Sequence, residues 1–335
     1  MPTPRRSCPR VSEPFAMSDD DQAAALLPRF PVNLEAPDLR PWRMGNTGIP
    51  GVHSFASDVA GPHLLVTALV HGNEIAGAIL LDRLLRAAPA PRRGRITLAL
   101  ANLEAFARFS PEDPTASRFI DEDLNRVWEE HMLEGSGRSA ELHRARELRP
   151  VVDQADVLLD LHSMLWPSDP LILTGRSAQA AALGVAIGVP PAVVADDGHL
   201  CGRRLIDYHR FTAPGAEGGA LLVEAGQHWE AATVDAMEGC FRQIAGRLGI
   251  LAPVAPLPPG RLAQVTCTVT AQTDGFAFLR SYRGGEIIAE RNTLIALDGE
   301  TEIRTPHDEC MLVMPSPRTL RGHTAVRLAR FARFA

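Results

Sequence analysis

Residues 63–86 read HLLVTALVHGNEIAGAILLDRLLR, and this stretch decides the fold. Its first part, 63–70, is apolar and contains β-branched side chains, which predicts a buried strand. Residues 74–86 carry apolar side chains at helical spacing and predict a helix. A buried strand that passes at once into a helix is the repeating unit of a parallel sheet with helices on both faces.

The same alternation continues on the C-terminal side of this unit. Ligands of such sheets bind at the carboxyl ends of the strands, so the residues found there are candidates for function. His71, His162 and Glu224 each end or directly follow an apolar run. We therefore predict an α/β fold with a mainly parallel mixed sheet flanked by helices. The remaining elements are predicted as strands 95–101, 156–162, 171–174, 192–195 and 220–224, and as helices 139–148 (ended by Pro150), 177–187 and 229–248.

The pattern changes after residue 252. Residues 253–260 are Pro-rich and are typical of a linker. Beyond them, 261–335 contains short apolar runs split by Gly, Pro, Asp and Asn, which predicts a small all-β domain. At the other end, 1–20 is polar and Pro-rich and predicts a disordered lead, so the α/β domain is expected within 21–252. Strands of the small domain are predicted at 264–271, 276–280, 286–289, 293–297, 310–314 and 325–328.

The composition of the 335-residue chain excludes several classes of protein. All 34 basic residues are Arg, against 40 acidic residues and a formal net charge of −6. The absence of Lys excludes a Walker A phosphate loop, Schiff-base and pyridoxal-phosphate enzymes, and lipoylated or biotinylated carriers. An acidic chain does not favour nucleic acid as its main partner.

Three further absences bear on the compartment. No apolar run approaches the ~20 residues that a membrane-spanning helix needs. The 5 cysteines include no C-x-x-C pair, and their odd number does not suit a disulfide framework. The N-terminal residues include no apolar stretch of signal-peptide length. We therefore expect a cytoplasmic protein with reduced thiols and with no membrane partner.

His71 and Glu74 lie three positions apart at the predicted turn from strand to helix, so both side chains can face one point. An imidazole and a carboxylate suit Zn²⁺, and His162 would complete the two-His, one-Glu set of catalytic zinc sites. Asp160 is either a carboxylate that orients a ligand histidine or a locally paired group. Taken alone, H-x-x-E also arises by chance, and a histidine at a strand end is common without a metal.

Two further segments carry candidate chemistry. Glu224 closes an apolar strand, where a buried carboxylate has a raised pKa that suits a general base; the alternative is a partner for a buried Arg. Residues 118–126 (RFIDEDLNR) are polar and loop-like. Within them, Arg118 is a candidate for stabilising an oxyanion, and Asn125 with Arg126 for binding a carboxylate. The alternative is a solvated loop of surface ion pairs, which composition alone favours.

These motifs, taken in their order along the chain, resemble the motifs of the succinylglutamate desuccinylase/aspartoacylase family. That family belongs to the zinc carboxypeptidase-like superfamily. The resemblance covers roughly residues 60–330 and implies a zinc carboxypeptidase-like α/β domain followed by a small β domain. Four ordered motifs are far more specific than any one of them. They are 71–74 (HGNE), 123–126 (DLNR), 160–162 (DLH) and 223–226 (VEAG).

The resemblance implies roles for individual residues. His71, Glu74 and His162 correspond to the ligands of one Zn²⁺ per chain. Glu224 corresponds to the catalytic carboxylate, which acts as general base towards a metal-activated water. Arg118 corresponds to the arginine that polarises the substrate carbonyl.

Substrate binding is implied in the same way. Asn125 and Arg126 correspond to the pair that holds the substrate carboxylate. Arg203 and Arg204, in a loop region rich in Gly and Asp, are looser candidates for binding the tail of the substrate. These roles imply a zinc-dependent hydrolase of linear amide C–N bonds whose substrate is a small N-acyl amino acid.

Two other functions stay open at this point. One is a zinc carboxypeptidase that acts on short peptides, which needs the same metal but an open cleft. The other is a non-catalytic protein that binds a metal or a carboxylate, although pure binding needs no base at Glu224. The acyl group, the amino acid and assembly into a homo-oligomer are also open.

Overall fold

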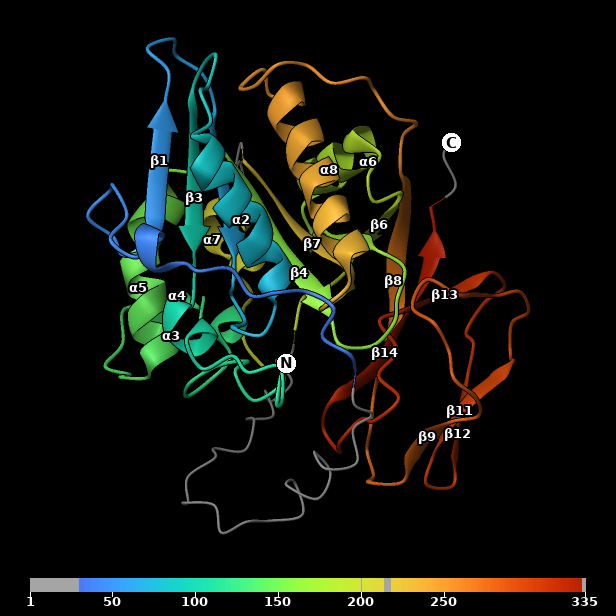
Figure 1. The fold of residues 1–335 in the computed structure, drawn as a ribbon. Helices are drawn as coiled ribbons and strands as arrows, with labels where there is room; N and C mark the ends of the chain where they lie inside the picture. Colours follow the sequence, from blue (N-terminus) through green and yellow to red (C-terminus); the bar gives the residue numbers. More distant parts are fainter. Residues whose placement is uncertain (1–29, 200, 214–217, 333–335) are drawn as a thin grey trace.

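A computed structural model describes residues 30–199, 201–213 and 218–332 of the chain. Within these residues, 11 strands form one large sheet (Figure 1). The strands are β1 (Val52–Ala56), β2 (His63–Ala68), β3 (Arg95–Leu100), β4 (Val157–Met164), β5 (Leu171–Leu173), β6 (Ala192–Ala195), β7 (Gly219–Gln227), β8 (Arg261–Thr270), β10 (Ile287–Ile288), β13 (Cys310–Val313) and β14 (Thr324–Phe331). Their order in the sheet is β1-β3-β2-β4-β7-β5-β6-β8-β14-β13-β10.

The centre of the sheet is parallel, as the sequence predicts. Strand β2 pairs in parallel with β3 and β4, and β4 pairs in parallel with β7. Antiparallel pairs of β1 with β3 and of β5 with β7 make the sheet mixed. In the register of β4 and β7, His162 lies opposite Glu224. Two candidate site residues from distant parts of the chain are therefore neighbours on adjacent strands.

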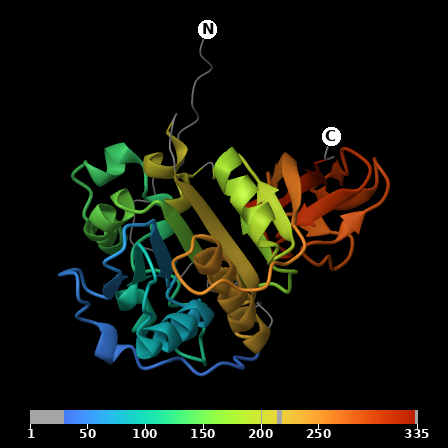
Figure 2. The same ribbon diagram turned by 90° about the horizontal axis from the view of Figure 1, so that it is seen from above.

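Helices cover both faces of this sheet. Figures 1 and 2 show α2, α6 and α8 over one face, with α5 on the opposite side. The helices are α2 (Ile75–Ala87), α3 (Leu103–Phe106), α4 (Glu130–Leu133), α5 (Ala140–Asp153), α6 (Ala178–Ile187), α7 (His209–Thr212) and α8 (Ala231–Arg247), and the short 3₁₀ turns are η1 (Arg40–Trp42), η2 (Leu124–Arg126) and η3 (Leu205–Asp207).

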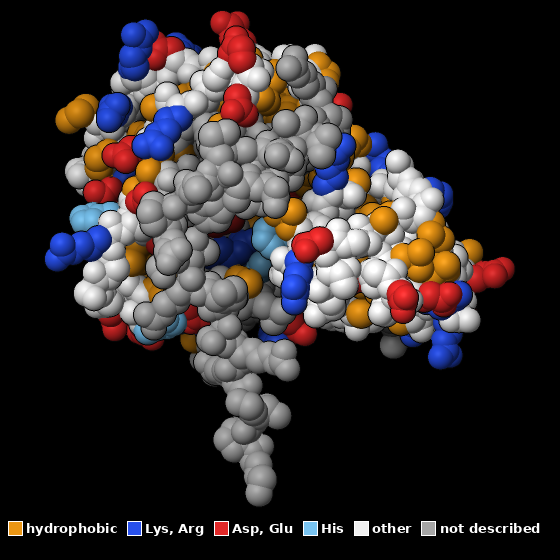
Figure 3. Space-filling view, turned by 90° about the horizontal axis from the view of Figure 1, so that it is seen from below, with side chains coloured by type: hydrophobic (Ala, Val, Ile, Leu, Met, Phe, Trp, Pro, Cys, Tyr) orange, Lys and Arg blue, Asp and Glu red, His pale blue; other side chains and the backbone are white. Residues whose placement is uncertain are grey.

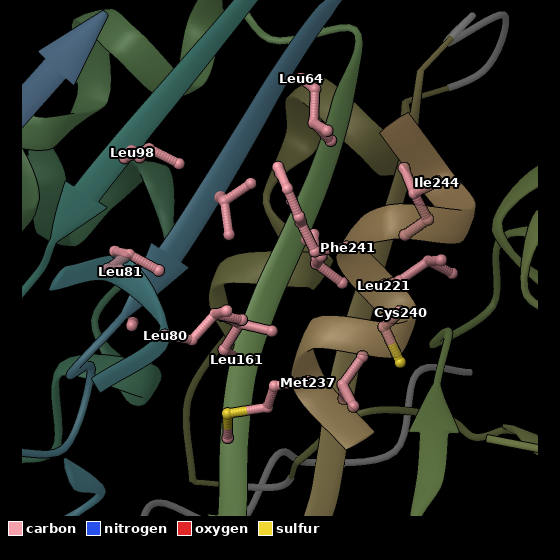
Figure 4. Packing of buried hydrophobic residues seen from close by; sticks show 14 of the residues in the cluster. Leu64, Leu80, Leu81, Leu98, Leu161, Leu221, Met237, Cys240, Phe241 and Ile244 are labelled. Carbon is pink, nitrogen blue, oxygen red and sulfur yellow. The ribbon is translucent and has the colours of Figure 1, made fainter. Parts of the chain in front are cut away.

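Each face of the sheet has its own apolar core. Successive side chains of a strand point to opposite faces, so β4 contributes Leu159 and Leu161 to one core and Leu158 to the other. Figure 4 shows Leu161 of the first core packed with Leu80 of α2 and Met237 of α8. This burial on both faces explains why the central strands are continuous apolar runs in the sequence.

The sheet continues into the C-terminal residues. Strand β8 pairs in parallel with β6 and antiparallel with β14, so the later strands extend the same sheet. A separate antiparallel sheet contains β9 (Phe276–Phe278), β11 (Leu294–Asp298) and β12 (Thr301–Arg304). The predicted fold class, a large mixed sheet flanked by helices with a small β part, is confirmed. The exact domain boundaries at 252–261 stay a prediction.

Some details differ from the sequence analysis. The helix predicted to end before Pro150 instead runs to Asp153. Proline lacks one N–H donor, but Pro150 lies in the last turn, and the continued helix keeps Val152 buried. Strands β1 and β12 were not predicted, because VHSFA and TEIR are short, mixed segments that are mostly not buried.

Two expectations concern the ends of the chain and membranes. The predicted disordered lead, 1–20, lies outside the described residues. Across the part of the chain that the structure describes, no helix combines the length and the apolar character needed to cross a membrane.

Candidate active site

The turn after β2 places His71 and Glu74. The strand ends at Ala68, and Glu74 is the residue immediately before α2. Gly72, between the two candidate ligands, packs so closely that a Cβ atom there would overlap the backbone of Ala105 and Phe106. A glycine is therefore needed for the turn to approach this neighbouring segment.

The structure brings His71, Glu74 and His162 together in what we call the His–Glu–His cluster. All three residues are buried, and one potential ligand atom from each lies within 4.8 Å of the other two. His71 Nδ1 lies 2.7 Å from Glu74 Oε1, and His162 Nδ1 lies 3.2 Å from Glu74 Oε2. The same nitrogen of each ring thus faces the shared carboxylate, which is the convergence that the sequence predicts.

The outward-facing ring nitrogens contact carboxylates. His162 Nε2 lies 2.9 Å from Asp160 Oδ2, so Asp160 contacts the candidate ligand histidine, and its role in orienting that ring stays a prediction. Thr67 donates from its hydroxyl to the other Asp160 oxygen at 2.5 Å. His71 Nε2 lies 2.9 Å from Asp123 Oδ1. A carboxylate behind a metal-binding histidine holds the ring in place and makes it a stronger base.

These contacts set the charge of the cluster. Burial opposes charging of His162, but Asp160 and Glu74 outweigh it and hold the pKa of His162 well above its ordinary value. Burial likewise opposes ionisation of Glu74, yet His71 and His162 lower the pKa of Glu74 well below its ordinary value. The fold thus keeps an ionised carboxylate between two imidazoles.

Glu224 differs from every other acid at this edge of the sheet. Its side chain is buried, and Oε2 has no hydrogen-bond partner among the described residues. Burial raises the pKa of Glu224 to about 8, while His162 acts to lower it and Glu74 to raise it. A carboxyl group with a pKa near neutrality can both accept and release a proton at neutral pH.

The loop that precedes η2 contributes Arg118, and η2 itself contributes Asn125 and Arg126. Arg118 Nη2 lies 2.9 Å from His71 Nε2 and donates to Asp123 at 3.2 Å. Asn125 is buried, and its side-chain oxygen accepts a hydrogen bond from the Leu205 backbone N–H. The predicted loop is therefore packed against the site, rather than lying as a solvated set of surface ion pairs.

Arg126 and Arg203 lie on neighbouring backbone segments, because Val127 forms an isolated β-bridge with Arg203. Arg126 donates to the Asn125 carbonyl oxygen at 2.7 Å and lies 4.0 Å from Asp123. Arg203 lies 3.4 Å from Glu129, and about a third of each side chain is exposed. The predicted roles of Asn125, Arg126 and Arg203 in substrate binding stay predictions.

Arg204 lies in a second buried group, which we call the arginine cluster and define as Arg204, Asp196 and Asp207. Arg204 donates to both oxygens of Asp196, at 2.9 and 2.6 Å, and to Asp207 at 2.6 Å. Burial acts to lower the pKa of Arg204, but the two carboxylates raise it overall. Its guanidinium is thus fully engaged with the protein, and its predicted role towards the substrate tail stays a prediction.

A cavity of about 240 Å³ opens onto the His–Glu–His cluster. Figure 3 shows histidine and arginine side chains beside each other in a hollow at this edge of the molecule. Part of the cavity lining comes from the C-terminal residues Met314, Pro315, Ser316, Thr324 and Arg327. The last strands therefore contribute to the same cavity as the candidate site. The other lining residues are His71, Glu74, Arg118, Ser163, Met164, Leu165, Trp166, Ser168, Glu224 and His228.

The sequence analysis missed several polar residues that line this cavity or contact the His–Glu–His cluster. Asp123 stood in the DLNR motif without a role, and Ser163 and His228 directly adjoin quoted motifs. Ser163 Oγ lies 2.7 Å from His228 Nδ1, and burial lowers the pKa of His228 to about 4, so the ring is neutral. Arg327 had no sequence signal, because it lies in a strand far from every motif.

Comparisons with known proteins relate this chain to a described family and to a known fold. Residues 60–171 match the family described as Succinylglutamate desuccinylase/Aspartoacylase catalytic domain. The succinylglutamate desuccinylase of Pseudomonas paraeruginosa is 34% identical over 113 residues, which are 31% of this chain and 32% of that protein. The chain thus matches about a third of the length of this relative. The succinylglutamate desuccinylase of Burkholderia lata is 26% identical over 293 residues, covering 80% of this chain and 78% of that protein.

A solved structure extends the likeness to the fold of nearly the whole chain. The crystal structure of succinylglutamate desuccinylase from Vibrio cholerae superposes with a TM-score of 0.65 and 18% identity. The superposition covers 84% of this chain and 86% of that chain. At this identity the likeness concerns the fold alone.

Proposed function

Because the chain belongs to the succinylglutamate desuccinylase/aspartoacylase family, we propose that it is a metal-dependent amidohydrolase that removes the acyl group from a small N-acyl amino acid. The observation that carries the proposal is the meeting of two chemical groups in one cavity. His71 and Glu74 of the His–Glu–His cluster line the cavity, and so does Glu224, a buried carboxyl whose Oε2 has no hydrogen-bond partner among the described residues.

The donor set fits a zinc ion. Two imidazole nitrogens and a carboxylate, buried and mutually close, are the three protein ligands of many catalytic zinc sites. When bound to His71, Glu74 and His162, Zn²⁺ would supply Lewis-acid polarisation of the substrate carbonyl and acidification of a water molecule. Asp160 and Asp123 would then hold the two rings from behind.

Residues of the chain supply proton transfer and stabilisation of the oxyanion. Glu224 accepts a proton at its free oxygen as water attacks the amide carbonyl, and it later passes that proton to the departing amine nitrogen. Arg118 lines the cavity and places a guanidinium beside the developing oxyanion. Together these steps convert an N-acyl amino acid and water into a carboxylic acid and a free amino acid.

The dimensions of the cavity support a small substrate. A volume of about 240 Å³ is below the usual range of ~300–1,000 Å³ for drug-sized ligands. Met314, Pro315 and Ser316 also line this cavity, and we expect them to limit the room for an extended peptide. We therefore favour an N-acyl amino acid over a longer peptide, with Asn125 and Arg126 as the binding site for its α-carboxylate.

A substrate panel tests this function. Purified protein loaded with Zn²⁺ is offered N-acyl amino acids that differ in the acyl group and, in parallel, short peptides with a free C-terminus. We expect release of the free amino acid from at least one N-acyl amino acid, loss of this activity with a chelator, and recovery on addition of Zn²⁺.

Each alternative predicts a different result. Cleavage of the peptides alone would identify a carboxypeptidase. Tight metal binding without hydrolysis of either panel would indicate a binding protein. His162→Ala is expected to lower the amount of metal bound per chain, as measured by elemental analysis, and an unchanged amount would reject the proposed ligand set.

A further inference from the structure

Glu141 is a buried carboxylate that the proposed chemistry does not use. It lies in the first turn of α5, and 0% of its surface is exposed. Arg144, one turn further along the same helix, pairs with Glu147 instead. A fold retains a buried carboxylate only where other contacts offset the cost of burying its charge, so the partners of Glu141 need an explanation.

Four N–H groups take the place of a cation around Glu141. Its Oε1 accepts hydrogen bonds from the Asn102 side-chain amide at 2.9 Å and from the Ile120 backbone N–H at 2.7 Å. Its Oε2 accepts from the backbone N–H groups of Asp121 and Glu122, at 3.0 and 3.2 Å. Two bonds to each oxygen use the full accepting capacity of a carboxylate. Glu141 therefore fixes three consecutive backbone amides of one loop to α5.

The fixed amides lie between two residues that contact the His–Glu–His cluster. On their N-terminal side, Arg118 places Nη2 2.9 Å from His71 Nε2, and its carbonyl oxygen accepts from the Gly72 N–H at 3.0 Å. On their C-terminal side, Asp123 places Oδ1 2.9 Å from the same His71 nitrogen. The backbone that Glu141 holds thus sets where both side chains meet this ring.

Arg118 depends on this backbone more than a buried side chain would. Its side chain is 38% exposed, so packing alone does not fix its position. Its side-chain partners Glu74, His71 and Asp123 all belong to the site itself. A support that lies outside the site and holds the loop is therefore needed to define the direction of approach of Arg118.

A second pair of contacts joins the same helix turn to the same loop. The Ala140 backbone N–H donates to Asp121 Oδ2 at 2.7 Å, and the Ser139 hydroxyl donates to the Glu122 carboxylate. The loop therefore donates to α5 through its backbone and accepts from α5 through its side chains. Bonds in both directions fix the loop against sliding along the helix as well as against lifting from it.

We propose that Glu141 is a positioning residue, which holds Arg118 and Asp123 against His71 through the backbone of residues 120–122. This inference rests on the proposed function, because it takes His71 as a metal ligand and Arg118 as the group beside the oxyanion. Glu141 itself does not line the cavity. The position of α5 is thus passed to the site by one carboxylate and three amides.

Glu141→Gln tests the first step, the hold on the loop. The variant keeps the shape of the side chain but replaces one oxygen by an NH₂ group, which faces two N–H donors whichever way the amide is turned. We expect faster hydrogen exchange of the amides 120–122, measured by mass spectrometry on the metal-free protein. Glu147→Gln removes a half-exposed acid of the same helix and is the matched control, with exchange at the wild-type rate.

The affinity for Zn²⁺ tests the second step, the effect on His71. Titration against a competing chelator should show affinity about 3–10-fold weaker in Glu141→Gln, a smaller loss than the ~10–100-fold expected when a carboxylate that contacts a ligand histidine is removed. In the Asp123→Asn background, Glu141→Gln should cause little further loss, because the residue through which it acts is already altered. A merely structural role would give the same loss in both backgrounds.

Turnover tests the effect on Arg118 separately. In protein saturated with Zn²⁺, kcat for an N-acyl amino acid that the wild type hydrolyses should fall about 10-fold in Glu141→Gln, since a displaced guanidinium stabilises the oxyanion less well. The same change in the Arg118→Ala background should lower kcat far less. Equal losses with and without Arg118 would show that Glu141 does not act through this arginine.

The outcomes are distinguishable. Unchanged exchange of the loop amides, unchanged Zn²⁺ affinity, or a loss of affinity that is independent of Asp123 would each overturn the proposal. If Glu141→Gln does not fold, Asp121→Ala removes the second contact between α5 and the loop and replaces it in the same measurements. If the wild type hydrolyses no N-acyl amino acid, the proposed function fails, whereas hydrogen exchange and Zn²⁺ affinity still decide the role of Glu141.

Discussion

The protein contains two buried clusters of charge, and they are built in opposite ways. In the arginine cluster, Arg204 lies between Asp196 and Asp207 and donates to both. In the His–Glu–His cluster, two imidazoles face one carboxylate, while the free oxygen of Glu224 stands beside them without a partner among the described residues. The first cluster pairs its charges internally, whereas the second lies beside a carboxylate oxygen that has no such pairing.

This contrast separates structural from functional burial of charge. A buried charge without partners costs several kcal/mol, so a fold retains it only where pairing or use compensates for that cost. Arg204 is compensated by pairing inside the protein. Glu224 is not, and its raised pKa of about 8, caused mainly by burial, is the consequence. Buried acids alone do not indicate a site, whereas an unpaired acid in a cavity is a candidate functional residue.

The largest expected effect comes from Glu224. Glu224→Gln keeps the shape of the side chain but removes proton transfer, so turnover should fall by about 10²–10⁴-fold. The amount of bound metal should stay at the wild-type level, since Glu224 is not among the proposed ligands. Steady-state kinetics and elemental analysis measure the two quantities. Near-normal turnover would remove Glu224 from the mechanism, and Glu238→Gln, at a partly exposed position of α8, serves as control.

Arg204→Met tests the claim that the arginine cluster is structural. The change leaves Asp196 and Asp207 without their main cation, so the free energy of unfolding should fall by about 3 kcal/mol. Urea denaturation measures this loss, and KM of the folded variant should stay close to that of the wild type. A raised KM with unchanged stability would instead support the substrate-binding role predicted for Arg204 from the sequence.

Asp160→Asn tests whether the carboxylate behind His162 affects the metal affinity of the His–Glu–His cluster. Losing the negative charge weakens the hold on the ring, and metal affinity should fall about 10–100-fold. Titration against a competing chelator measures the affinity. Thr67→Val removes only the hydroxyl that donates to Asp160, so its loss should be smaller and in the same direction. Unchanged affinity in Asp160→Asn would limit its role to packing.

The smallest effect is a pH dependence of stability at His199. The pKa of His199 is about 3 in the fold, mainly because of burial, against about 6.5 for an unfolded histidine. A depressed folded-state pKa gives stability that is fully present above about pH 6.5 and is lost as the pH falls. His199→Gln should remove at most about 1 kcal/mol of the wild-type loss between about pH 7.5 and pH 5.5. Parallel denaturation curves at both pH values provide the measurement, and an equal loss of stability in the two proteins would contradict it.

Local patterns in the sequence predicted most of the central elements. The apolar run 63–70 and the helical spacing of 74–86 correspond to β2 and α2 within a few residues. The rule that parallel strands carry ligands at their carboxyl ends is enough to select His71, His162 and Glu224 from the order of apolar runs. Pro150 shows the limit of such rules, because burial of Val152 outweighs the local signal to end the helix.

The side-chain contacts of the site residues could not be predicted from the sequence. Nothing in the spacing of Asp123 or Thr67 shows that their side chains reach His71 and Asp160, since these pairs are 52 and 93 residues apart. Arg204 illustrates the same point, because an arginine in a polar loop has the same sequence signature whether it is free or engaged with two carboxylates. The partners of a side chain depend on tertiary packing, and tertiary packing leaves no periodic pattern in the nearby sequence.

The sequence by itself determined the layered α/β architecture, the identity of the candidate metal-binding set and the candidate base, since hydrophobic periodicity and residue chemistry are local properties. Only the tertiary structure decided which charges are satisfied internally and which face the cavity. It also decided that β14, a strand from the C-terminal part of the sequence, lines that cavity with Arg327. The physical reason is that strand register and sheet order bring together residues whose separation along the chain carries no information about their distance in space.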